Sequence, residues 1–206
     1  FVGARPRTDG IDFIVEDSQG TPLLIEDPIP NSNRFSAASW MSVSAGKIAI
    51  GAKDKATIDV FITVPYDARP GGRYAAVLFE VTGTTLNPKD SPQPESASVI
   101  APRVASLFYI RIAGDAKELA ILSNFKTPSL SESGPVPVSF EIANRGDIHI
   151  KPKGLITISD WYGRNIFQEK IEEVNIFPDA SRMYETKTGK DFMIGRYKIK
   201  IAASYG

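Results

Sequence analysis

The residue types in this sequence that could carry out chemistry are few. His149 is the only histidine and there is no cysteine, so a transition-metal site would need carboxylates beside a single imidazole. A Ser-His-Asp triad would also have to use His149, yet no G-x-S-x-G turn accompanies it. In the stretch IHIKPKG, His149 alternates with Ile148 and Ile150, which predicts that it lies on the strand face opposite those isoleucines.

The acidic residues are scattered, as in EDSQG, IEDP and EKIEE, and none forms the D-x-D-x-D-G pattern of a calcium loop. The glycine-rich signatures of phosphate binding are also absent from the sequence. A pair of glycosidase carboxylates assembled from distant strands stays open, because sequence spacing does not test it. We expect no catalytic residues, no metal, no cofactor and no enzymatic activity.

Binding residues are easier to find, and the strongest candidates lie in DWYGRN, residues 160–165. Gly163 is predicted to take the turn between two strands, which places Trp161, Tyr162 and Arg164 near a hairpin tip. Exposed aromatic rings can stack on sugars or anchor a protein contact. The alternative, that Trp161 folds down to cap the core, is left open.

A second candidate is the corner VPYDARPGGRYAAVLF, residues 64–79, where prolines and glycines separate two strand-like runs. Tyr74 is predicted to turn its ring inward, with its hydroxyl bonding back to the chain as in a tyrosine corner, and Tyr197 is expected to act likewise later on. The functional alternative is a binding edge made by Tyr66, Arg69 and Arg73.

The tripeptide RGD occurs at Arg145–Asp147, a pattern that some integrins recognise. A three-residue match is weak evidence, and the surrounding NRGD favours a plain turn built by Asn144 and Gly146. Adhesion through this tripeptide is the less favoured interpretation.

The elements that must position these residues are many short strands separated by turns. Runs such as ATIDVFITV, VPVSFEIAN and GRYKIKIAAS alternate apolar and polar residues. Only DAKELAIL, residues 115–122, has a helical pattern, and it is too short and too close to strands to predict a helix. Trp40 is expected in the core at a strand start. The polar stretch 83–98 is interpreted as a long hairpin loop.

The predicted fold class is all-β, with two tandem immunoglobulin-like β-sandwich domains at 1–114 and 115–206 and a boundary in AGDAKE, residues 113–118. The two GRY glycines, Gly72 and Gly195, suggest a loose internal repeat. The chain has 206 residues and equal numbers of basic and acidic residues, 24 of each, so no global field draws it to nucleic acid or an anionic membrane.

The order ASW, KIAIGAKDKATIDVFITVP and DARPGGRYAAVLFE resembles the first domain of bacterial WxL-interacting cell-surface proteins. The second half, from GPVPVSFEIAN to DWYGRNI, is similar to the immunoglobulin-like domain that follows it. The resemblance implies peptidoglycan binding by the first domain and protein partners for the second. The strand that such domains carry ahead of IDFIVEDSQG is expected to be short or missing.

We therefore expect an extracytoplasmic binding protein, at the cell surface or secreted, whose partners are peptidoglycan or other surface proteins. Any membrane attachment would come from an anchor outside this chain. The alternative is a structural subunit of a surface filament or layer that self-associates by β-strand addition at an open sheet edge.

Overall fold

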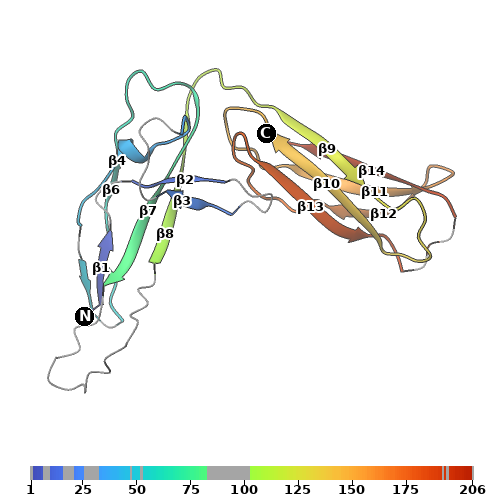
Figure 1. Cartoon of the computed structure of the whole chain (residues 1–206), viewed down its shortest axis with the longest axis horizontal. Helices are drawn as coiled ribbons and strands as arrows, with labels where there is room; N and C mark the ends of the chain where they lie inside the picture. The colour runs from blue at the N-terminus through green and yellow to red at the C-terminus, as the bar shows by residue number, and fades with distance from the viewer. Residues whose placement is uncertain are drawn as a thin grey trace, which may run out of the picture. The chain divides into compact units, whose positions relative to one another are not determined.

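The computed structural model describes residues 2–6, 10–15, 21–25, 33–46, 48–51, 53–82, 103–191, 193 and 195–205. Within these residues the chain consists of strands and a single turn of 3-10 helix, which confirms the predicted all-β class (Figure 1). The elements are β1 (Val2–Pro6), β2 (Asp12–Ile14), β3 (Leu23–Ile25), η1 (Ala38–Trp40), β4 (Met41–Val43), β5 (Ile48–Ile50), β6 (Val60–Ile62), β7 (Gly71–Thr82), β8 (Arg103–Ile112), β9 (Ala120–Lys126), β10 (Val136–Asn144), β11 (Lys153–Asp160), β12 (Asn165–Lys170), β13 (Ser181–Thr188) and β14 (Tyr197–Ser204).

The chain divides into two compact units. Unit 1 comprises Phe1–Ile14, Leu24–Arg69 and Arg73–Ile112, and unit 2 comprises Val15–Leu23, Pro70–Gly72 and Ala113–Gly206. In the described part of the chain, no helix has both the length and the hydropathy of a transmembrane segment.

Unit 1 contains a four-stranded sheet in the order β5-β1-β7-β8 and a two-stranded sheet of β4 and β6. The strand material expected to be short or missing before residue 11 is present as a strand of five residues. Residues Val2–Pro6 form β1, which pairs antiparallel with both β5 and β7. Its pairing partners lie more than forty positions away in the sequence (Gly3 opposite Ala49 and Thr82), so a local pattern could not reveal it.

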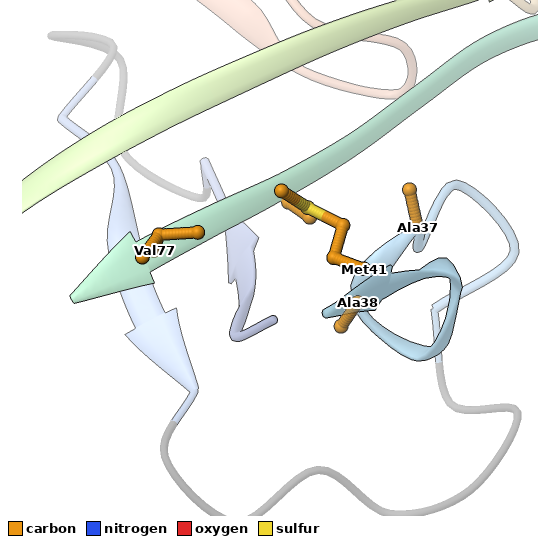
Figure 2. Close-up of a cluster of buried hydrophobic side chains, with 5 residues drawn as sticks. Ala37, Ala38, Met41 and Val77 are labelled. Atoms are coloured by element: carbon orange, nitrogen blue, oxygen red, sulfur yellow. The ribbon is translucent and has the colours of Figure 1, made fainter. Parts of the chain in front are cut away.

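The core of unit 1 gathers on β7, whose central residues are inaccessible to solvent. Ala75 and Val77 are 0% exposed and pack with Ala37, Ala38 and Met41 from the segment around η1. In Figure 2, Met41 extends from its strand toward β7. Around this small cluster the neighbouring apolar side chains are only half-buried: Trp40, Val43, Val60, Phe79, Phe108 and Ile110.

Unit 2 contains two three-stranded antiparallel sheets, β13-β10-β9 and β12-β11-β14. Alternate residues of their central strands point inward, as period-two alternation requires. Phe140 of β10 stacks on Tyr184 of β13 with ring centroids 5.0 Å apart, while Ile156 and Ile158 of β11 are 2% and 0% exposed. Both sheets thus supply the core of unit 2.

Residues 115–122, whose helical pattern is too short to predict a helix, do not form one. Ala120 begins β9, which pairs with β10 instead of forming a helix. The apolar residues Ala120, Ile121 and Leu122 lie in a strand because they pair with β10. Pairing with a distant strand outweighs the helix propensity of so short a segment.

Candidate functional site

The hairpin tip between β11 and β12 is built around one carboxylate. Asp160 accepts hydrogen bonds from the backbone amides of Tyr162 and Arg164, at 3.0 and 2.9 Å, and from the Arg164 Nε at 2.8 Å. Gly163 follows at φ +84°, a conformation that glycine adopts without steric cost. The predicted turn at Gly163 is therefore present, and the hydrogen bonds to the Asp160 carboxylate stabilise it.

These contacts also set the protonation of Asp160. Its partial desolvation acts to raise the pKa, but the bonds from the Arg164 backbone and side chain, together with the guanidinium charge, leave the pKa lowered overall. Asp160 is therefore an anion at neutral pH, with Arg164 as its counterion.

The tip presents two aromatic rings to solvent. Trp161 is 73% exposed and Tyr162 is 67% exposed, and their ring centroids lie 4.0 Å apart. The Arg164 guanidinium lies 5.4 Å from the Tyr162 ring centroid, within cation–π range. Trp161 is therefore exposed at the tip and does not fold down to cap the core. The structure brings Trp161, Tyr162 and Arg164 together as one surface.

Two hollows flank the tip. One, of about 800 Å³, runs along the outward faces of β11 and β14. The other, of about 550 Å³, lies toward Lys190 and Met193. Both are lined by Asp160, Trp161, Arg196 and Tyr197, so Trp161 borders each of them.

The basic residues of this surface were missed in the sequence. Arg196, Lys198 and Lys200 line the larger hollow. The signal was present in GRYKIKI, where Lys198 and Lys200 alternate with isoleucines and must share the polar face of a strand. Tyr197, predicted to be an inward corner tyrosine, is half-buried and borders the hollow.

The corner at residues 64–79 separates its candidate residues. Tyr66 and Arg69 are exposed, whereas Arg73 is 9% exposed. The Arg73 Nη2 donates to the Arg69 carbonyl at 3.1 Å, and its guanidinium lies 5.9 Å from the Trp40 ring centroid. The structure therefore does not bring Arg73 to the surface edge proposed for it.

Tyr74 is buried at 3% exposure, as predicted, and packs edge-to-face against Phe13 and Tyr109. The two GRY segments differ in backbone: Gly195 has φ +119°, whereas in the first copy Gly71 and not Gly72 has a positive φ. The supposed repeat is not reproduced in local geometry.

The RGD tripeptide is held in a turn on both sides. Gly146 is buried and donates to the Asn144 side chain at 2.9 Å, and the Asp147 carbonyl accepts from the Gly72 amide at 2.8 Å. A side chain at Gly146 would meet the Lys117 carbonyl at 2.6 Å, so glycine is required there. These contacts fit the predicted turn.

His149 is half-buried beside Phe177, while Ile148 and Ile150 are both 4% exposed, so the predicted alternation is correct. Among the described residues no three His, Cys, Asp or Glu side chains group as metal ligands. The loop predicted at 83–98 lies outside the described residues.

A second surface of interest is β8, which is the last strand of its sheet in the described part of unit 1. Its first four residues are exposed, including Val104 at 64%, and Tyr109 is 42% exposed. An ion pair of 3.4 Å between Arg103 and Glu80 ties the start of β8 to β7. Sequence alternation had identified this strand but not its position at an edge.

No family model matches the sequence, and no curated protein matches it. Solved structures that are similar to it include the following two. One is described as a chaperone–tip adhesin complex vital for synergistic activation of CFA/I fimbriae biogenesis, with 10% identity, 97% of this chain and 84% of that chain covered, and a TM-score of 0.45. The other is the class 5 fimbriae chaperone CfaA, with 12% identity, 97% and 85% covered, and a TM-score of 0.46. At this level of likeness no residue role is carried over to the present chain.

Proposed function

We propose that this chain binds an extended segment of another protein by β-strand addition at the β8 edge, and that it serves in this way in the assembly of a surface filament outside the cytoplasm. The observation that carries the proposal is that β8 is the last strand of its sheet within the described part of unit 1. It is a ten-residue strand with exposed apolar side chains. Such an edge presents backbone donors and acceptors that an added strand can pair with.

The incomplete cover of the unit 1 core supports the same proposal. Phe108 and Ile110 of β8 pack against the buried cluster yet remain half-buried, as do Val60 and Phe79. A strand added beside β8 would place its own alternate side chains next to Phe108 and Ile110 and remove apolar surface from water. Edge strands of stable monomers usually carry charges that discourage pairing, and from Val104 to Ile110 β8 carries none.

The role proposed is binding and not catalysis, carried by two tandem immunoglobulin-like sandwich domains divided near residues 113–118. The two similar structures concern fimbriae and offer a class of partner to try, but the proposal depends on the β8 edge. Peptidoglycan binding and membership of the WxL-interacting family stay predictions from resemblance, without a supporting contact among the described residues.

The test uses an artificial strand as the probe. A peptide of about ten residues that alternates valine and threonine can add to an edge in one register, whereas a peptide of the same composition with the valines in a block cannot. Isothermal titration should detect binding of the alternating peptide only. Hydrogen exchange should show new protection confined to β8.

Matched substitutions locate the site. Val104→Lys adds a charge to the β8 edge and should weaken peptide binding about tenfold or more, by edge protection. Leu130→Lys makes the same change at a residue that is 85% exposed in unit 2, and it should leave binding unchanged. Equal binding of both peptides, or protection that spares β8, would overturn the proposal. Protection of β8 by self-association, detected by light scattering without peptide, would identify another copy of this chain as the partner.

A further inference from the structure

A charged and polar surface covers the outward face of the β12-β11-β14 sheet. In β11 the outward side chains that line the larger hollow are Leu155, Thr157 and Ser159, because Ile156 and Ile158 occupy the inward positions. In β14 the outward side chains are Lys198, Lys200 and Ala202. We call these six residues, with Arg196 and the Trp161–Tyr162 tip, the basic face.

The strand register places hydroxyl groups beside ammonium groups. Ser159 lies opposite Lys198, and Thr157 lies opposite Lys200. On the other side of β11, the Ser159 hydroxyl donates to Asn165 Oδ1 at 2.9 Å. A lysine ammonium group therefore lies beside a neutral hydroxyl group at two successive outward positions along the strands.

The charge of the basic face is predominantly positive. Arg196, Lys198 and Lys200 line the larger hollow. Among the described residues, the one carboxylate that lines it is Asp160, which already accepts hydrogen bonds from Arg164 and two turn amides. Within the described part of the chain, no ion pair joins Lys198 or Lys200 to a carboxylate. The protein has zero net charge overall, so this positive potential is local.

The aromatic tip adds a different kind of contact at one end of the same face. Trp161 borders both hollows, and the tight turn around Asp160 fixes the backbone that carries its exposed ring. Aromatic faces of this kind stack on the apolar faces of sugar rings while polar groups around them bind hydroxyls.

We propose that the basic face binds an acidic polysaccharide, a linear chain of sugars that carry carboxylate groups. The lysines would pair with the carboxylates, Thr157 and Ser159 would bind sugar hydroxyls, and Trp161 would stack on one ring. Single-stranded nucleic acid fits less well, since it needs successive aromatic platforms along the strand, and only one end of this face is aromatic. A lipid surface fits less well because Leu155 and Ala202 are the face's aliphatic side chains.

The experiment measures binding of the whole chain to three polymers by biolayer interferometry at low salt. Sodium polygalacturonate is the acidic glycan, dextran is the neutral glycan, and poly-L-glutamate is an acidic polymer without sugars. Polygalacturonate should bind, and its affinity should fall as salt is added, because exposed charges are screened over about 10 Å at 0.1 M salt. Dextran and poly-L-glutamate should bind at least about tenfold more weakly.

Three variants separate the contributions of the lysines and of Trp161 to polygalacturonate affinity. Lys198→Gln with Lys200→Gln should reduce polygalacturonate affinity about tenfold, and Trp161→Ala should reduce it by a similar factor. The matched control, Lys126→Gln with Lys187→Gln, removes the same charge from exposed positions on the other sheet of unit 2 and should change affinity less than about twofold.

The assignment would be overturned if polygalacturonate failed to bind, if poly-L-glutamate bound as tightly, or if Trp161→Ala had no effect. The proposal is independent of strand addition at β8. Val104→Lys, which lies in unit 1, should leave polygalacturonate binding intact, so failure of one proposal is distinguishable from failure of the other.

Discussion

The side-chain amide of Asn144 donates hydrogen bonds to the Ile148 carbonyl at 2.8 Å and to the Ile176 carbonyl at 2.9 Å, and Asn144 is fully buried. Its Oδ1 accepts from the Gly146 amide at 2.9 Å. One side chain thus satisfies three backbone groups and joins the NRGD turn to a segment some thirty residues further on.

Replacing Asn144 by alanine should destabilise the fold strongly. Asn144→Ala leaves the Ile148 carbonyl and the Gly146 amide without these partners in a buried place, and it removes one of the two hydrogen bonds to the Ile176 carbonyl, which also accepts from the Ile150 amide. We expect a loss of about 3 kcal/mol in the free energy of unfolding. Urea denaturation measures it. Asn165→Ala is the matched control, because Asn165 is exposed and should cost less than about 0.5 kcal/mol. A loss below about 1 kcal/mol for Asn144→Ala would contradict this account.

Thr188 is a buried polar residue, 0% exposed, whose side chain, unlike that of Asn144, makes no hydrogen bond among the described groups. Thr188→Val keeps the shape and removes the unpaired hydroxyl, so stability should stay equal or rise by up to about 1 kcal/mol.

Thr188→Ser keeps the hydroxyl and deletes a buried methyl, and it should destabilise by about 1 kcal/mol. Thermal unfolding of both variants, followed by circular dichroism, compares them. A lower melting temperature for Thr188→Val than for Thr188→Ser would show that the hydroxyl has a partner after all.

The hairpin tip should respond to acid. Because the pKa of Asp160 is lowered in the folded chain, the contribution of its contacts is present above the ordinary aspartate pKa of about 3.9 and is lost as pH falls through the lower folded value. Fluorescence of Trp161 reports the change, in a Trp40→Phe background that removes the other tryptophan.

We expect a transition in Trp161 emission with its midpoint below the ordinary aspartate pKa, while far-ultraviolet circular dichroism stays constant. Asp160→Asn should abolish that transition, since an amide does not titrate in this range. A midpoint at or above the ordinary value, or the same transition in Asp160→Asn, would show that Asp160 does not hold the tip.

Local alternation was enough to predict much of unit 2. The pattern around His149 placed Ile148 and Ile150 in the core, and the glycine turn at residues 160–165 located the aromatic tip. These features depend on neighbours within a few positions, where the period of a strand and the φ of glycine leave few alternatives.

The sequence by itself determined the strand-rich class, the turns and the side of each strand on which a residue lies. Only the tertiary structure decided the pairing of β1, the strand at Ala120–Lys126, the edge position of β8 and the burial of Arg73. The physical reason is that alternation sets which face a side chain takes, whereas strand order depends on partners distant in the chain. Whether a side chain at a sheet edge or a hairpin tip is exposed therefore depends on which distant segments pack against it.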